Sequence, residues 1–376
     1  MSGFAEKLSK RVENGDCMRY YRLNKILKYN AKYNMIISGR SDGKTYAVLE
    51  HIVKNACIQG KQGAIIRRFQ DDFIGKRGSQ MFAALIDNGV IEKETHGLWN
   101  SVYYYASKWY FCNVKDGKMT NREEKPFCYG FAITAMEHDK STAYPNVTVI
   151  LYDEFVTRSM YLPDEFVLFC NVLSTIIRQR DDVTIFMCGN TVNKYCPYFK
   201  EMGLKHVLQM RQGDIELYKY GDSGLTVAVE YADVNKKFGK RSDVYFAFEN
   251  PKLQMITGGA WELDIYPHCP RKYRPKEVVF NFFIVFDNDI IHCEIVCGGF
   301  DLFVYAHPKT TEIQHPDRDL QYNANTSSNL PNIRRTFAKP SDEIDQKIYK
   351  LYQDNRFFYS DNEVGDAIRN FVLNTR

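Results

Sequence analysis

Short apolar runs recur along the first half of the chain, and the stretches between them carry helical patterns. The runs are continuous or nearly so, which is typical of strands buried on both faces of a sheet. They fall at residues 35–37, 64–66, 147–152 and 183–188. A helical pattern follows the first run, because apolar side chains recur there at i, i+3, i+4 and i+7: Leu49, Ile52, Val53 and Ala56. This alternation predicts an α/β domain around a central, mostly parallel sheet.

Further elements fill the region between these runs. A helix is predicted over about 70–88, with Phe73, Phe82, Leu85 and Ile86 on its apolar face. Aromatic strand segments are predicted within 99–134, and Asp116-Gly117 is a hairpin-type turn. At least one strand is therefore expected between the strands at 35–37 and 147–152. A second helix is predicted over about 163–178.

The last third of the chain has a different pattern. Apolar segments at 278–286, 290–296 and 302–305 are separated by short turns, which predicts an antiparallel meander. Helices are expected at 342–355 and from Ser360 onward, where Ser360 and Glu363 have the spacing of a capping box. We therefore expect a first domain at 1–208 and another at 251–376, with residues 209–250, whose periodicity is weak, between them.

Composition narrows the class of protein. The chain has 376 residues, is 44% hydrophobic and carries 50 basic and 46 acidic residues. A net charge of +4 is too mild to establish nucleic-acid binding on its own. The ten cysteines are scattered without a Cys-x-x-Cys pair, so they indicate neither a zinc site nor a disulfide framework. With no signal peptide or membrane-length apolar run, we expect a soluble, intracellular protein without membrane contact.

The loop after the first apolar run carries the strongest chemical signal. Residues 38–45 read Ser-Gly-Arg-Ser-Asp-Gly-Lys-Thr and lead directly into the helical pattern. A strand, a Gly-Lys-Thr loop and a helix make a phosphate-binding loop, whose backbone N–H groups face phosphate. Lys44 would reach the outer phosphates of ATP, and the Thr45 hydroxyl would hold Mg²⁺. Ser38 stands where the common pattern has glycine, and the alternative is an ordinary turn with a surface lysine.

Polar residues end two of the other buried strands. Asp153 and Glu154 follow the run at 147–152, and Asn190 follows the run at 183–188. In a nucleotide hydrolase, the first carboxylate, here Asp153, helps to hold Mg²⁺, and the second, here Glu154, polarises the attacking water. Asn190 would sense the terminal phosphate. The alternative is a strand that ends in a solvated turn. Together with the loop, this pattern fits a P-loop NTPase of the ASCE type, in which a strand separates the two motifs.

Several cations are candidates for phosphate or DNA contact. Arg67 and Arg68 end the strand at 64–66, and their alternative is a salt-bridged edge. Lys140 is a candidate phosphate or DNA contact, and Arg178 is a candidate arginine finger at a helix end where cations are also favoured by the helix dipole. A basic cluster interrupted by Phe238 suits nucleic-acid phosphates or a solvated helix face: Lys236, Lys237, Lys240 and Arg241.

These motifs resemble the DNA-packaging ATPases of phi-29-like tailed phages, which are related to large terminases. Their order and spacing agree over about residues 30–205, and the match is fainter in the last third. The segments that carry the resemblance are 37–47, 66–68, 140–147, 153–155, 178–180, Asn190 and 197–199.

The resemblance implies an ATP-driven motor that moves double-stranded DNA into a phage prohead. It implies that Glu154 activates water, that Arg178 acts in trans on a neighbour's nucleotide, and that Lys140 and Arg40 belong to the site. It implies a homo-oligomeric ring, expected to be a pentamer, at the portal vertex in the host cytoplasm, and leaves open a structural packaging RNA.

The resemblance also implies a linker subdomain at 209–250 and an RNase H-like domain at 251–376. The first strand there has no central carboxylate, so we expect that domain to lack nuclease residues. The alternatives are another P-loop DNA-dependent ATPase, such as a helicase or helicase loader, and a non-catalytic assembly protein that binds nucleotide structurally.

Overall fold

A computed structural model describes the chain at residues 20–138, 142–157, 161–233, 266–287, 289–298, 301–326 and 330–375. The described residues divide into two units. The first contains the described parts of 20–157, 164–191 and 196–233, and the second contains those of 161–163, 192–195 and 266–375. No helix in these described ranges is long and apolar enough to cross a membrane.

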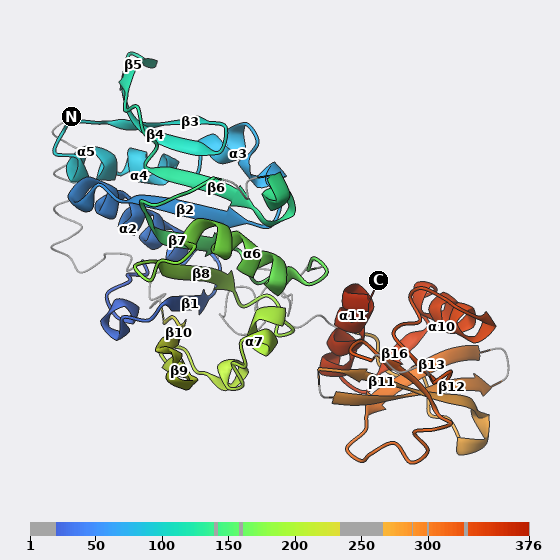
Figure 1. Ribbon diagram of the computed structural model, residues 1–376. Coiled ribbons are helices and arrows are strands. Elements are labelled where there is room, and N and C mark those ends of the chain that lie inside the picture. The colour runs from blue at the N-terminus through green and yellow to red at the C-terminus, as the bar shows by residue number, and fades with distance from the viewer. Residues whose placement is uncertain are drawn as a thin grey trace, which may run out of the picture. The chain divides into compact units, whose positions relative to one another are not determined.

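The first unit is built on one large sheet (Figure 1) with the strand order β3-β4-β6-β2-β7-β8-β1-β10-β9. Its centre is parallel: β6 (Cys128–Ala132), β2 (Gln62–Arg67), β7 (Val147–Asp153), β8 (Thr184–Asn190), β1 (Tyr33–Ser38) and β10 (Leu225–Tyr231). Antiparallel strands extend both edges: β3 (Ser101–Tyr105), β4 (Lys108–Lys115) and β5 (Lys118–Arg122) at one, and β9 (Ile215–Tyr220) at the other. The predicted α/β class with a mostly parallel sheet is confirmed.

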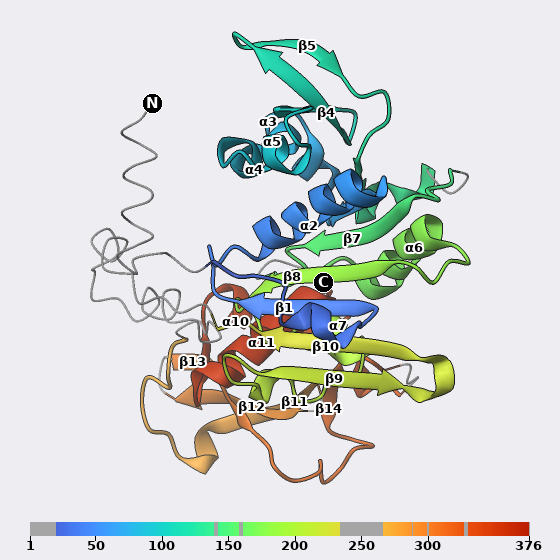
Figure 2. The same cartoon turned by 90° about the vertical axis from the view of Figure 1, so that its left-hand side faces the viewer.

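Two helices cover opposite faces of this sheet. Leu151 of β7 lies in the apolar cluster that contains Val48 and Ile52 of α2 (Lys44–Gln59). The next residue, Tyr152, points to the other face and stacks on Phe169 of α6 (Glu165–Ile177) with ring centroids 4.9 Å apart. Because successive side chains of a strand alternate between faces, α2 and α6 lie on either side of the sheet (Figure 2).

The strand between the loop strand and the acidic strand is β8, which pairs with β1 on one side and β7 on the other. Strands β2 to β6 lie between β1 and β7 in the sequence, as predicted, but none of them is the strand that separates β1 from β7 in the sheet. The chain instead supplies it after the acidic strand. Ser38 aligns with Asn190, and Asp153 aligns with Cys188, so the polar ends of all three strands meet at one edge of the sheet.

The predicted helix over 70–88 is wrong. Four short turns of helix occupy this region: η2 (Gln70–Phe73), α3 (Lys76–Ser79), α4 (Ala83–Asp87) and α5 (Val90–Glu94). Gly75 and Gly89 adopt positive φ angles of 55° and 69° at the breaks, which an α-helix cannot continue through. The apolar positions Phe73, Phe82 and Leu85 are nevertheless buried in the core.

The second unit contains a six-stranded sheet with the order β15-β14-β11-β12-β13-β16. The predicted meander is present as β11 (Val278–Phe286), β12 (Asp289–Gly298) and β13 (Asp301–Pro308). Parallel pairings add β14 (Leu320–Asn323) to β11, β15 (Ile333–Arg334) to β14 and β16 (Phe357–Tyr359) to β13. Helices α10 (Glu343–Gln353) and α11 (Asn362–Thr375) follow. The assignment of this unit as an RNase H-like domain stays a prediction.

The predicted capping box at Ser360 is wrong by one residue. Asp361 Oδ1 accepts the Val364 N–H at 2.9 Å, which is the bond that a capping side chain makes at the start of α11. The Ser360 hydroxyl donates to Asp361 Oδ2 at 2.8 Å and orients the capping carboxylate instead.

The boundaries between the two units differ from the predicted domain boundaries. Strands β9 and β10 belong to the first sheet, so this unit continues past residue 208 into the expected linker. Conversely, 192–195 belongs to the second unit. Tyr195 lies in its apolar core, 5.5 Å from the ring of Phe286, and Asn193 donates to Asn370 at 2.9 Å. Residues 234–265 of the expected linker and third domain lie outside the described residues.

Candidate active site

The loop between β1 and α2 has the conformation of a tight anion cradle. Ser41 and Gly43 both adopt positive φ angles, 61° and 88°, and α2 begins directly at Lys44. The N–H groups of the first helical turn therefore face outward from the loop. Tyr21 anchors the loop to the sheet. Its N–H donates to the Asp42 carbonyl of the loop at 2.9 Å, and its phenol donates to Glu230 of β10 at 2.6 Å. Sequence reasoning missed this anchor.

Lys44 is folded back over the loop. Its ammonium donates to Ser38 Oγ at 2.9 Å, to the Gly39 carbonyl at 2.8 Å and to Asn190 Oδ1 at 3.0 Å. The side chain that replaces glycine at position 38 is thus fully buried and helps to hold the lysine. These contacts bring the loop lysine and the polar end of β8 together, as the sequence predicts. Arg40 is exposed beside them.

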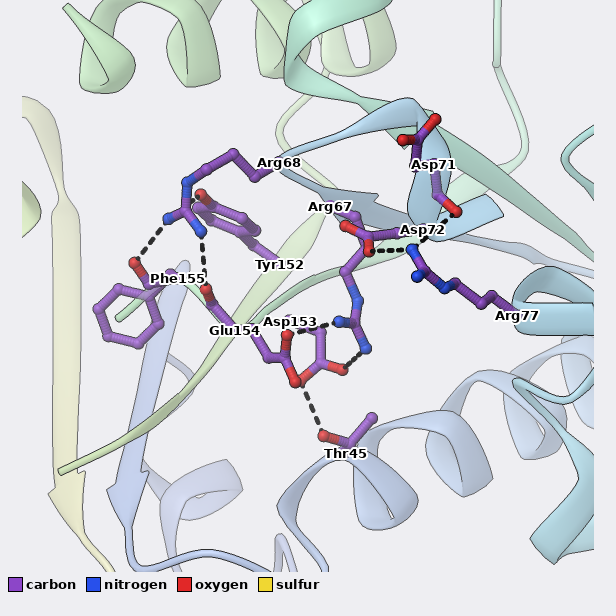
Figure 3. A network of polar contacts seen from close by, with 10 residues as sticks. All are labelled: Thr45, Arg67, Arg68, Asp71, Asp72, Arg77, Tyr152, Asp153, Glu154 and Phe155. Carbon is purple, nitrogen blue, oxygen red and sulfur yellow. Dashed lines mark hydrogen bonds and ion pairs between the residues drawn. The ribbon is translucent and has the colours of Figure 1, made fainter. Parts of the chain in front are cut away.

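Thr45, Asp153 and Arg67 form a second group at the same edge (Figure 3). The Thr45 hydroxyl donates to Asp153 Oδ1 at 2.8 Å, and Arg67 donates to Asp153 Oδ2 at 2.6 Å. The same guanidinium lies 2.9 Å from Glu154 Oε2. A hydroxyl and a carboxylate at this spacing are oxygen ligands of the kind Mg²⁺ prefers. Thr45 and Asp153 are therefore the residues that fit a magnesium ion.

Glu154 follows the strand in a conformation that non-glycine residues seldom adopt, with φ at 60°. Its carboxylate is 64% exposed, whereas that of Asp153 is buried. The two acidic residues thus differ in setting: one is fixed beside Thr45, and the other is held by Arg67 at the rim. Residues 41–46 and the ends of β7 and β8 line a cavity of about 280 Å³ at this point.

Arg68 does not face solvent, which contradicts its prediction as a DNA contact. Its guanidinium makes a paired contact with Glu165 at 2.7 and 2.9 Å. It also donates to the backbone carbonyls of Glu154 at 3.4 Å and Phe155 at 3.1 Å (Figure 3). Arg67 is also engaged with carboxylates rather than free for DNA. A strand end alternates its side chains between faces, so one arginine enters the candidate site and the other enters the core.

Glu165 is the centre of a buried polar network that sequence reasoning missed. The phenols of Tyr152 and Tyr198 donate to it at 2.8 and 2.9 Å, in addition to the Arg68 contact. Burial raises the pKa of both phenols, so they stay protonated and act as donors. Burial and the neighbouring Asp153 likewise raise the pKa of the Cys188 thiol beside the cavity. The only sequence signal for the network was an acidic residue at the start of an otherwise apolar helix.

The remaining predicted site residues lie elsewhere or outside the described residues. Arg178 ends α6, and its guanidinium donates to the Thr142 carbonyl at 3.1 Å, before the start of β7. Asp153 ends β7, and six residue steps of a strand span roughly 20 Å, so Arg178 does not reach the cavity of its own chain. Lys140 lies outside the described residues, as do Lys236, Lys237, Lys240 and Arg241.

Comparison with known proteins places this site in context. The family described as "Podovirus DNA encapsidation protein (Gp16)" matches residues 15–240, which is more than half of the chain. The DNA packaging protein of Bacillus phage B103 is 26% identical over 223 residues, covering 58% of this chain and 62% of that protein. The DNA packaging protein of Bacillus phage phi29 is 25% identical over 185 residues, covering 48% of this chain and 49% of that protein. The match therefore spans about half to three fifths of these relatives.

A solved structure extends the likeness to the whole chain at the level of the fold. The phi-28 DNA packaging motor superposes with a TM-score of 0.54 at 16% sequence identity, covering 96% of this chain and 99% of that one. At this identity the superposition concerns the fold alone.

Proposed function

The chain belongs to the Podovirus DNA encapsidation protein (Gp16) family, and from this we propose that it hydrolyses ATP to drive double-stranded DNA into a phage prohead. One observation carries the proposal. Lys44 and Thr45 at the start of α2, Asp153 and Glu154 at the end of β7, and Asn190 at the end of β8 converge on one cavity. An ordinary strand–turn–helix segment would not bring these side chains together.

Each group has a distinct task in the proposed reaction. The loop N–H groups and Lys44 bind the phosphates. Thr45 and Asp153 would hold Mg²⁺, which would supply positive charge to the phosphate oxygens. Glu154, as the accessible carboxylate, accepts the proton of the attacking water. Asn190 holds Lys44 before nucleotide arrives and contacts the terminal phosphate afterwards.

Completion of the site requires a second copy of the chain. Arg178 lies at the end of the strands opposite the cavity, so it serves a neighbour's nucleotide if the chains form a ring. An arginine supplied in trans contributes about 10³–10⁵ in rate in comparable phosphoryl-transfer enzymes. The partners that we propose are double-stranded DNA, the portal of the prohead and further copies in a pentameric ring, with a packaging RNA as a possible addition. The place of action is the portal vertex in the host cytoplasm.

The second unit is proposed to make contacts rather than to cut DNA. A two-metal nuclease needs clustered carboxylates, and within the described ranges no group of three Asp or Glu residues is close enough to hold a metal. Cleavage of DNA by the full chain with Mg²⁺ or Mn²⁺, at a rate unaffected by loss of ATP hydrolysis, would contradict this assignment.

The function is tested by ATP-dependent DNA uptake into purified proheads supplied with this protein. Glu154→Gln should bind ATP normally and abolish both turnover and uptake, because the amide cannot accept the proton. Glu92→Gln is the matched control, since Glu92 is exposed on α5 away from the cavity. Turnover by Glu154→Gln at the wild-type rate would refute the proposed role of this residue, and turnover without uptake by the wild-type protein would refute the packaging function.

A further inference from the structure

Three chemistry-bearing side chains gather on one face of the second unit. His292 and Glu294 stand two residues apart on β12, so they point to the same side of the sheet, and His307 on β13 is the direct cross-strand neighbour of His292. One ligand atom of each lies within 4.8 Å of the other two. The opposite face of the same strands, with Ile291, Cys293 and other core residues, packs under the helices.

Neighbouring groups orient two of these side chains. The Tyr273 phenol donates to Glu294 Oε2, which fixes that carboxylate. His307 Nδ1 lies 3.2 Å from the Pro308 carbonyl, which can only accept, so Nδ1 carries the hydrogen. The other nitrogen, Nε2, then keeps its lone pair and faces Glu294 Oε2 at 3.7 Å.

The third side chain is held in the same way. His292 Nε2 lies 3.0 Å from Asn281 Oδ1 on the adjacent strand, and the ring stacks on Phe283 at 4.9 Å. In protein metal sites the second nitrogen of a ligating imidazole is usually hydrogen-bonded, and a ligating carboxylate usually accepts a further hydrogen bond. All three side chains are partly buried, so they are restrained without being closed to solvent.

We propose that His292, Glu294 and His307 form a binding site for one divalent transition-metal ion, with Zn²⁺ the best-matched occupant. Two imidazoles and one carboxylate are a ligand set that zinc accepts with a fourth position left open to water. The hard ions Mg²⁺ and Ca²⁺ prefer all-oxygen sets. Tetrahedral zinc with bonds of about 2.0–2.1 Å places its ligand atoms roughly 3.3 Å apart, so small side-chain rotations complete the site.

The nearby Lys309 opposes metal binding, so its removal gives a test with a predicted direction. The Lys309 ammonium lies 5.9 Å above the Phe283 ring and donates to Thr311 at 2.8 Å, beside the same face. Its positive charge repels a metal ion at the cluster, so Lys309→Gln should tighten metal binding. A role limited to the Glu294–His307 ion pair predicts no effect of this change on any metal.

The test uses Co²⁺ as a spectroscopic substitute for Zn²⁺ in the chelator-treated full-length protein. Tetrahedral Co²⁺ shows visible d–d absorption, and we expect it to saturate at one ion per chain and to be displaced by Zn²⁺. His292→Ala and His307→Ala should abolish the signal. Tyr273→Phe should weaken binding by about 10–100-fold, as loss of an outer partner does. His315→Ala is the matched control, because His315 is an exposed histidine of the same unit that is not one of the three clustered residues.

Two outcomes would overturn the proposal. One is a Co²⁺ spectrum that persists in the His292→Ala and His307→Ala variants. The other is strong near-ultraviolet absorption from thiolate ligation, which would assign the metal to cysteine. Glu294→Gln, which keeps the shape of the side chain, guards against loss of folding as the cause: circular dichroism should match wild type while Co²⁺ binding falls.

Discussion

At the scale of single residues, Arg67 is the cation shared by both acidic residues of the site. It lies 2.6 Å from Asp153 and 2.9 Å from Glu154. Two adjacent carboxylates repel each other, and one of them is buried. The Arg67 guanidinium therefore offsets both charges in the nucleotide-free protein, and in the proposed reaction Mg²⁺ bound with ATP would supply positive charge at the same place.

Arg67→Ala should lower the free energy of unfolding of the nucleotide-free protein by about 3 kcal/mol, because it leaves a buried carboxylate without its partner. Excess MgATP should restore part of the lost free energy of unfolding. Urea unfolding with and without MgATP measures both effects. Arg77→Ala is the control: its side chain is 69% exposed and its pair with Asp72 is 3.9 Å long, so the change should stay within about 0.5 kcal/mol. An equal loss in both variants would show that Arg67 is no more than a surface cation.

Arg68 and Glu165 give a separate test in the core. Removing one partner of a buried ion pair costs about 3–5 kcal/mol, whereas replacing both removes the unpaired charge. Arg68→Met should therefore be strongly destabilising, and Arg68→Met with Glu165→Gln should recover much of the loss. A double-mutant cycle by urea unfolding measures the coupling. Strictly additive losses would mean that the pair does not hold the backbone behind Glu154.

The sequence predicted the residues that gather at the cavity better than it predicted the residues that hold them. Lys44, Thr45 and Asp153 stand at fixed positions relative to a strand end, so their placement follows from local pattern. The partner of Arg68 lies 97 residues away on α6, and no local pattern carries that pairing. Arg67 and Arg68 are indistinguishable in the sequence. Because side chains alternate along the strand, Arg67 lies at the rim of the cavity and Arg68 is buried.

At the scale of elements, strands were predicted more accurately than the helices between 70 and 94. The apolar runs are long enough to fix strand positions, and their buried neighbours fix their pairing. The four short helical segments contain the same spacing of apolar residues as one long helix. Gly75 and Gly89 break them, and the segments remain folded because Phe82 packs on Trp109 of β4 at 5.6 Å. Tertiary packing of this kind is not visible in a periodic pattern.

The cap of α11 can be tested directly. Asp361→Ala should cost about 1 kcal/mol of unfolding free energy, because it removes the acceptor of the Val364 N–H. Ser360→Ala should cost less, since that hydroxyl only supports the carboxylate. Thermal and urea unfolding compare the two variants. A larger loss for Ser360→Ala would restore the capping box that the sequence predicted.

At the scale of the whole molecule, the two units are interleaved along the chain rather than arranged one after the other. The excursion at 192–195 contributes Tyr195, which is 8% exposed, to the core of the second unit. No local sequence pattern predicts this excursion, because it lacks a change of composition or a glycine-rich boundary.

Tyr195→Ala should destabilise the second unit by about 3–5 kcal/mol, as truncation of a buried aromatic ring does. Hydrogen exchange should then quicken in β11 and α11 while β2 and β7 keep their protection. Tyr105→Ala is the matched control, because that ring is 63% exposed. Faster exchange confined to the first sheet would contradict the assignment of Tyr195 to the second core.

The end of β8 has a mechanical consequence. Asn190 holds Lys44, the Thr191 N–H donates to the Ser38 carbonyl at 3.2 Å, and Val192 already belongs to the second unit. Two peptide units of backbone, whose covalent bonds scarcely stretch, therefore separate the residue that holds Lys44 from the first residue of the second unit. If Asn190 contacts the terminal phosphate, as we propose, any shift of its backbone reaches the chain of the second unit at Val192, two residues later.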